Sequence, residues 1–257
     1  DEYLGSKHYT GSPYYAVLVT AVYLWLIFYL LPWFMSSRKP YTFLRFIAVY
    51  NISQIIYNAI LCYLYVKLLN WQSLKIWENT CYPISAANNF DPAINVKIAA
   101  FGYYYYLNKV YDFTDTILFS LKKKSSQVTF LHVYHHTIMV PFMWVTIFAL
   151  REELFVIMAG MNTLIHFIMY IYYFLSNLGP AWQKYLWWKK YITTFQIMQF
   201  CSLLLLLAKL NYEGCKSSPY FTIMWTFVIT SFLILFVQFY LNTYKKKTSI
   251  VVLQKTN

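Results

Sequence analysis

Residues 13–35 read PYYAVLVTAVYLWLIFYLLPWFM, a run without a single charged side chain. A helix rises about 1.5 Å per residue, so this run can cross the hydrocarbon core of a bilayer, which is roughly 30 Å thick. Residues 46–66 and 219–244 are free of charge in the same way. In hydrocarbon every backbone amide needs a partner within its own segment, so these runs are predicted to be transmembrane helices.

The composition of the whole chain agrees with a membrane protein. Of its 257 residues 60% are hydrophobic and only 12% are charged, against about 25% charged residues in soluble proteins. Four further apolar segments carry polar or charged residues. We therefore predict an all-α integral membrane fold, one domain over residues 1–257 with seven transmembrane helices. The expected spans are residues 13–35, 46–66, 98–121, 127–150, 154–176, 191–208 and 219–244.

The positive charges are distributed unevenly over this layout. An odd number of spans places the two termini on opposite sides, and 13 of the 21 basic residues then fall on one side. The positive-inside rule assigns that side to the cytosol, with the N-terminus in the lumen. Because the basic residues flank spans, the net charge of +12 indicates topology and not nucleic-acid binding. The basic side holds Arg38, Lys39, Arg45, Lys122, Lys123, Lys124, Lys184, Lys189, Lys190, Lys245, Lys246, Lys247 and Lys255.

The cysteines divide in the same way. Cys62 and Cys201 lie within spans, where a thiol is usually a packing residue. Cys81 and Cys215 fall in two loops of the lumenal side, where oxidation is allowed. We predict a disulfide between them; two free thiols in flexible loops are the alternative.

Polar residues inside the spans are expected to meet in one layer. His132, His135 and His136 stand at i, i+3 and i+4, so one helical face presents all three. Counting residues from the connecting loops at about 1.5 Å each places Asp115 level with His132, and Asp112 level with the other two. The same count brings His166, Gln196 and Gln199 to a comparable depth, in the cytosolic half of the bilayer.

Ionisable groups in a membrane are costly, so such a layer is a candidate site, although an isolated member could be an interhelical hydrogen bond. A histidine cluster can bind metal, as in di-iron desaturases and hydroxylases, but four intramembrane histidines are few for that chemistry. Imidazole can also act as a base, or attack a thioester to give an acyl-imidazole in a desolvated site. Aromatic residues such as Tyr103 to Tyr106 could line a tunnel for an alkyl chain, or simply pack.

Four motifs in order resemble those of the very-long-chain fatty acid elongases, the membrane 3-ketoacyl-CoA synthases of the endoplasmic reticulum. They are KVYDFTDT at 109–116, FLHVYHH at 130–136, NTLIHFIMYIYY at 162–173 and TTFQIMQ at 193–199. The chain departs from the family in Asp112, where a glutamate is usual. The resemblance implies seven helices around a buried acyl-chain tunnel, and condensation of a fatty acyl-CoA with malonyl-CoA to give 3-ketoacyl-CoA, CoA and carbon dioxide.

The resemblance also implies no cofactor and no metal, a location in the endoplasmic reticulum membrane, and separate ketoreductase, dehydratase and enoyl reductase partners. A homodimer is possible within this reading. We expect His135 to be the acyl acceptor or principal base. The remaining catalytic candidates are His132, His136, His166, Asp112, Asp115 and Asn162. The substrate-binding candidates are Lys109, Thr116, Tyr170, Tyr173, Gln196, Gln199 and, for the phosphates of CoA, Lys122, Lys123, Lys124, Lys189, Lys190 and Lys245.

Two other readings remain open at this point. A di-iron desaturase or hydroxylase would contain bound iron, and a transporter or receptor would have no condensing activity. The lysines near the spans could hold phosphates, or only set the topology.

Overall fold

The computed structural model describes residues 2–7, 10–69, 92–150, 152, 154–214 and 217–245, and these contain helices but no strand. Cys81 and Cys215 lie outside the described residues, so their disulfide stays a prediction. Labels with η mark π-helical turns. The helices are α1 (Glu2–Gly5), α2 (Pro13–Trp25), η1 (Leu26–Leu30), α3 (Leu31–Met35), α4 (Leu44–Leu69), α6 (Pro92–Tyr111), α7 (Phe113–Leu121), α8 (Phe130–Trp144), η4 (Val145–Leu150), α9 (Phe155–Asn177), α10 (Pro180–Gln183), α11 (Lys189–Tyr212), α12 (Pro219–Tyr240) and η5 (Leu241–Lys245).

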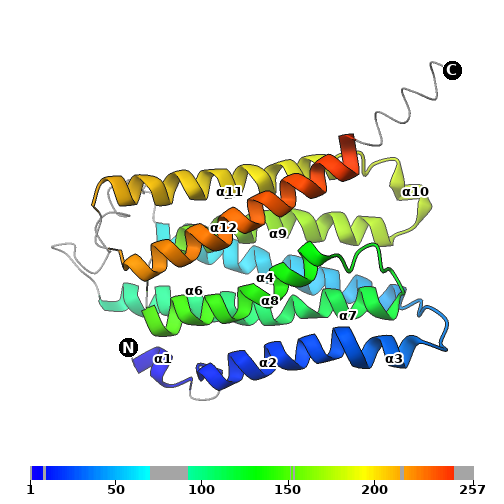
Figure 1. The fold of residues 1–257 in the computed structure, drawn as a ribbon, viewed down its shortest axis with the longest axis horizontal. Coiled ribbons are helices and arrows are strands. Elements are labelled where there is room, and N and C mark those ends of the chain that lie inside the picture. The colour runs from blue at the N-terminus through cyan, green and yellow to red at the C-terminus, as the bar shows by residue number, and fades with distance from the viewer. Residues whose placement is uncertain are drawn as a thin grey trace.

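The all-α prediction is confirmed, and six helical segments of the described chain are long and apolar enough to cross a membrane. They coincide with six of the seven expected spans. The expected span 98–121 is divided between α6 and α7, which meet at Asp112 and follow one another along the bundle (Figure 1). Its buried charges set it apart from the other six, so a seventh crossing remains a prediction.

The break at Asp112 is slight, since this residue keeps helical backbone angles with φ −59° and ψ −20°. Aspartate is a favoured residue at the start of a helix because its carboxylate can accept a hydrogen bond from the first turn. Asp112 stands at that position before α7, yet its side chain makes no capping bond. The carboxylate is turned into the bundle instead, where it becomes the centre of the polar cluster described below.

Close packing of α4 along α9 holds the middle of the bundle together. Gly160 of α9 is the contact point, since a Cβ built there would lie 2.4 Å from the ring of Tyr65 on α4. Elsewhere α11 packs along α12, and α2 packs along α8. The bundle is therefore an assembly of long helices that run between the same two ends.

The first of these ends, which we call the basic end, gathers the loops that sequence analysis assigned to the basic side. The backbone N–H of Tyr41 donates to the carbonyl of Leu121 at 3.1 Å, and the Asn177 amide donates to the carbonyl of Leu44 at 3.0 Å. Both bonds join connections that are far apart in the sequence. In Figure 1 the ends of α3, α7 and α9 accordingly lie together on the right.

The opposite end, the mixed-charge end, carries acidic as well as basic residues. Lys209 and Glu213 form an ion pair of 3.2 Å there. The carboxylate of Glu152 accepts a hydrogen bond from the backbone N–H of Ser218, directly before α12. A carboxylate at the start of a helix also interacts favourably with the helix dipole.

Exposed tryptophan and tyrosine side chains occur near both ends of the bundle, and others such as Tyr29 lie between them. Trp33 and Trp187 near the basic end are 73% and 70% exposed. Tyr212 and Tyr220 near the mixed-charge end are 92% and 75% exposed. Tryptophan and tyrosine are enriched at both membrane interfaces, so this distribution supports a bundle that crosses the membrane along its long axis.

Candidate active site

The carboxylate of Asp112 is the centre of the site and is almost completely buried. Its Oδ2 accepts a hydrogen bond from Lys109 Nζ at 2.8 Å, within the same ion pair. Its Oδ1 accepts from Gln54 Nε2 at 2.9 Å and from the Tyr170 hydroxyl at 3.1 Å. A buried charge is tolerated only when it is paired and hydrogen-bonded, and Asp112 meets both conditions.

The amide of Gln54 on α4 is fixed by its own neighbours. Its Oε1 accepts hydrogen bonds from the amides of Asn108 at 2.9 Å and Asn58 at 3.3 Å, which leaves its Nε2 to donate to Asp112. Sequence analysis missed Gln54 and Asn58 of α4, and also Asn108 of α6. The signal was present, since Asn51, Gln54 and Asn58 recur at helical spacing inside an apolar span, where polar residues mark functional or packing sites.

Tyr170 of α9 joins the two carboxylates of the first motif. Its hydroxyl lies 3.1 Å from Asp112 Oδ1 and 2.6 Å from Asp115 Oδ2. A phenol has one proton and can donate to one carboxylate at a time. The two acidic groups are therefore linked through a single shared donor.

Asn162 of α9 holds the other side of the ion pair. Its Oδ1 accepts from Lys109 Nζ at 3.2 Å and from the Tyr105 hydroxyl at 2.9 Å. Lys109 is 2% exposed, so its ammonium group is held between Asp112 and Asn162 inside the bundle. Asn162, a catalytic candidate from the sequence, contacts Lys109 and not a histidine in these hydrogen bonds.

His132 and Thr116 connect α8 to α7. The His132 Nε2 lies 2.9 Å from Thr116 Oγ1, which in turn lies 2.9 Å from the Tyr23 hydroxyl on α2. This contact confirms the expectation that His132 lies at the depth of the neighbouring Asp115. The three groups tie α2, α7 and α8 together at the level of the site.

The remaining histidines continue the layer toward α9. The rings of His132 and His136 are 4.3 Å apart between centroids, and those of His135 and His136 are 5.4 Å apart. His135 lies 6.5 Å from His166 of α9. The four imidazoles that sequence analysis placed at one depth are thus neighbours in the structure.

The imidazole beside Asp112 is that of His166, whereas the depth estimate had favoured His135 or His136. His166 Nδ1 lies 3.7 Å from Asp112 Oδ2, too far for a hydrogen bond, and this buried nitrogen has no hydrogen-bond partner among the described residues. Among the described residues, no group of three or more His, Cys, Asp and Glu side chains is arranged to hold a metal ion.

The fourth motif lies at the edge of this arrangement. Gln199 of α11 is buried and Gln196 is half-buried. Within the described part of the chain, no hydrogen bond joins either amide to the histidines or the carboxylates. Gln196 and Gln199 therefore lie in the bundle, but neither is hydrogen-bonded to the polar cluster in the described part of the chain.

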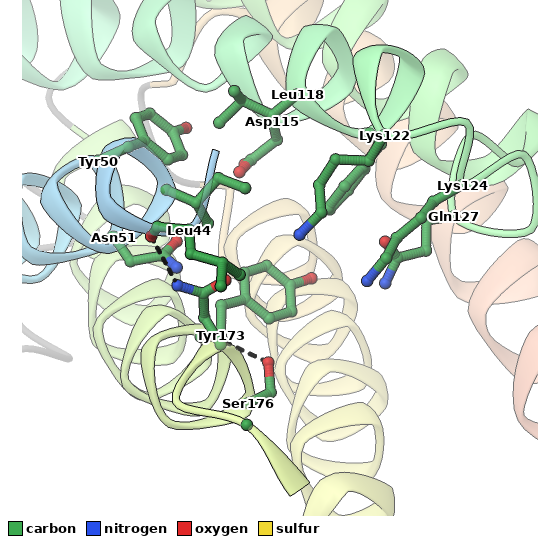
Figure 2. Close-up of a pocket in the computed structure, with 14 residues that line it drawn as sticks. Leu44, Tyr50, Asn51, Asp115, Leu118, Lys122, Lys124, Gln127, Tyr173 and Ser176 are labelled. Carbon is green, nitrogen blue, oxygen red and sulfur yellow. Dashed lines mark hydrogen bonds between the residues drawn. The ribbon is translucent and has the colours of Figure 1, made fainter. Parts of the chain in front are cut away.

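A pocket of about 270 Å³ connects the basic end to the cluster. Asp115 and Tyr173 form part of its wall on the inner side, and Lys122, Lys124 and Gln127 line its outer side. Figure 2 shows Lys122 and Asp115 directed toward the same space. Burial, followed by the charge of Lys124, lowers the pKa of the Lys122 ammonium below its ordinary value.

The other lysine candidates lie elsewhere. Lys123 lines a second pocket on the opposite side of α7. Lys189 and Lys190 are exposed at the start of α11 and do not line the first pocket. Lys245 closes η5, and its side chain lies outside the described residues.

Comparison with known proteins gives the site its context. Residues 8–251 match the family described as ELO: GNS1/SUR4 family. The chain belongs to this family. It is 34% identical to very long chain fatty acid elongase 1 of Mus musculus, over 92% of this chain and 83% of the relative. It is 33% identical to very long chain fatty acid elongase 4 of Homo sapiens, over 91% of this chain and 73% of the relative. All four motifs lie within the matched region.

Proposed function

We propose that this ELO-family chain catalyses the condensing step of fatty acid elongation. A long-chain fatty acyl-CoA and malonyl-CoA would give a 3-ketoacyl-CoA, free CoA and carbon dioxide. The observation that carries this proposal is the layer of four histidines beside a paired carboxylate, together with a lysine-lined pocket that extends from the basic end to the neighbouring Asp115. The names of the relatives add the substrate class.

In the first half-reaction, we assign to His135 the attack on the thioester carbon. Its ring lies between His166 and Phe232, with centroids 6.5 and 4.9 Å away, yet it stays half-buried and so retains free surface. The imidazole nitrogen would form a bond to the acyl carbon while the carbon–sulfur bond breaks and CoA leaves as a thiolate that takes up a proton. An enclosed layer would protect the acyl-imidazole from water.

In the second half-reaction, malonyl-CoA would lose carbon dioxide, and the electron pair of the broken bond would form a carbon–carbon bond to the acyl group. The carbon–nitrogen bond to His135 breaks in the same step and restores the imidazole. His132, His136 and His166 would stabilise developing oxyanions or move protons. Asp112 lies beside Nδ1 of His166 and would favour a proton on that nitrogen.

The acyl chain would lie in a tunnel within seven transmembrane segments, the seventh formed by α6 and α7. Tyr105, Tyr106 and Tyr170 are at most 2% exposed, so they present little open surface to an acyl chain. Tyr173 does border open space, since it lines the pocket at the basic end. We propose that chain length is limited by the depth of the tunnel below this pocket.

The membrane setting follows from the same proposal. The basic end would face the cytosol by the positive-inside rule, with the N-terminus lumenal and the C-terminus cytosolic. The membrane would be that of the endoplasmic reticulum, where a ketoreductase, a dehydratase and an enoyl reductase would process the 3-ketoacyl-CoA. We propose that the reaction needs no cofactor, and either a monomer or a homodimer is compatible with it.

Release of labelled carbon dioxide from malonyl-CoA by the purified protein, dependent on added acyl-CoA, tests the function. We expect His135→Ala to lower this release by a factor of at least about 10³ while the protein stays folded, because the acyl acceptor is lost. Wild-type turnover in His135→Ala would remove His135 from its role. Bound iron in an inactive wild-type protein would instead favour a desaturase or hydroxylase.

A further inference from the structure

A second pocket at the basic end lies outside the proposed catalytic path. It has a volume of about 380 Å³ and is open to the surroundings of the protein. Its inner part is formed by the buried side chains of Ile27, Leu31 and Met35 from η1 and α3. Its rim carries the exposed Lys123 and Ser125. We call this space the α3–α7 groove.

Helix α7 separates the groove from the catalytic pocket. Asp115, Leu118 and Lys122 follow one another at helical spacing and face the catalytic pocket. Ser120 and Lys123 belong to the other face and line the groove. Lys122 and Lys123, which are consecutive in the sequence, therefore line two different pockets. A single role in binding CoA does not explain this arrangement.

The backbone conformation of Lys123 places its side chain in the groove and not in the catalytic pocket. Lys123 has a φ of +51°, and it is the one described residue other than glycine with a positive φ. The left-handed conformation costs a residue with a Cβ roughly 1–2 kcal/mol, and it persists only where the surroundings fix it. Its backbone N–H donates to the carbonyl of Ser120 at 3.0 Å, which closes the end of α7 around this turn.

The groove is amphipathic in the direction of the membrane normal. Trp33 of α3, 73% exposed, lies where an interfacial tryptophan is expected. Ile27 and Leu31 lie on the membrane side of that level, and the connection beyond α7 supplies the exposed ammonium of Lys123 and hydroxyl of Ser125. No acidic side chain from the described part of the chain lines it. A ligand with an anionic head and an apolar tail matches this order of groups.

We propose that the α3–α7 groove binds one anionic glycerophospholipid of the adjacent leaflet. Its phosphate would lie against Lys123 and Ser125, and one acyl chain would lie along Ile27, Leu31 and Met35. Basic pockets between helices near the membrane surface are suited to anionic lipid head groups. The site is independent of the condensation chemistry, because none of its lining residues lines the catalytic pocket.

Native mass spectrometry of the full chain in detergent tests the proposal, with phosphatidic acid and phosphatidylcholine of identical acyl chains as the probes. We expect one phosphatidic acid to bind the wild type more tightly than phosphatidylcholine. Lys123→Gly should weaken this binding about five-fold, the contribution of one lysine near a membrane surface. Glycine removes the charge and also suits the left-handed backbone, so the variant should fold at least as well as the wild type.

The matched control is Lys39→Gly, which removes one exposed lysine at the same end that lines neither pocket. It should bind phosphatidic acid as the wild type does, and Lys123→Arg should as well. Equal binding by Lys123→Gly and the wild type would overturn the proposal, as would equal binding of phosphatidylcholine. Displacement of the lipid by free CoA or by inorganic phosphate, each at the concentration of the lipid, would also overturn it.

Discussion

The two ends of the bundle differ in whether their basic side chains are balanced by acidic ones. At the mixed-charge end positive and negative side chains occur together, and Lys209 pairs with Glu213 at the surface of the protein. At the basic end none of the nine acidic residues occurs in the connections 36–43, 122–129 and 178–188, or after residue 240. One end is therefore neutralised by the chain itself, whereas the other needs anions from outside.

This difference explains where ligands are expected. The phosphates of CoA and of anionic lipids carry the charge that the basic end lacks, and both pockets described above open there. Between the ends lies a layer in which Asp112 is balanced by the one buried lysine of the described chain, Lys109. The charges are thus balanced within the protein at the mixed-charge end and in the middle layer, but they are not balanced at the basic end. Substitutions in each of the three regions can test this difference.

The largest effect is expected in the middle layer. Lys109→Met keeps the length of the side chain but leaves the carboxylate of Asp112 buried without its cation. Breaking a buried pair from one side costs about 3–5 kcal/mol, so the melting temperature in detergent should fall sharply. The double variant Lys109→Met, Asp112→Asn should recover much of that loss. A fall in the double variant as large as in the single variant would show that packing and not charge is responsible.

A smaller loss is expected from a change that involves no charge. Gly160→Ala would press a Cβ against the ring of Tyr65, where the nearest atom is 2.4 Å away, and overpacking of this kind costs about 1–3 kcal/mol. The thermal stability of this variant should be low at every salt concentration. Gly5→Ala is the matched control, because a Cβ at Gly5 meets nothing within 4 Å. A salt-dependent loss in Gly160→Ala would contradict the steric explanation.

At the basic end, replacing Lys122 and Lys124 by alanine should raise the KM for malonyl-CoA about tenfold at low salt, with kcat little changed. The increase should shrink as the ionic strength rises, since exposed charges are screened. Lys209→Ala at the mixed-charge end is the control and should leave the KM unchanged at any salt. An unchanged KM in the variant at Lys122 and Lys124, with normal membrane insertion, would leave these lysines only the topological role.

The smallest effect concerns pH. Burial and the charge of Lys124 lower the pKa of Lys122, so this ammonium loses its proton at a lower pH than an ordinary lysine. Because the protonated form binds phosphate, the KM for malonyl-CoA should rise as the pH increases through that lowered pKa. Lys122→Arg stays charged throughout and should flatten the profile measured between about pH 7 and pH 9.5. Identical profiles for Lys122→Arg and the wild type would exclude Lys122 from the binding of CoA.

The sequence by itself determined the elements and the depth of their polar groups. Charge-free runs such as residues 13–35 must be helical because hydrocarbon offers no other hydrogen-bond partners. A helix also rises by a constant distance per residue, so counting from a loop placed His132 near Asp115 and brought His166 toward the histidine box. The motifs gave the family, and the matched residues 8–251 confirm it.

Only the tertiary structure decided which groups at one depth touch. Depth follows from the rise of each helix, but the rotation of a helix about its axis and its choice of neighbour follow from packing. Asp112 therefore lies beside His166 and not His135, and Gln54 of α4 joins the cluster because α4 packs along α9. The turn at Lys123 divides one basic run between two pockets for the same reason, since the surroundings of a single backbone conformation are set by the folded chain.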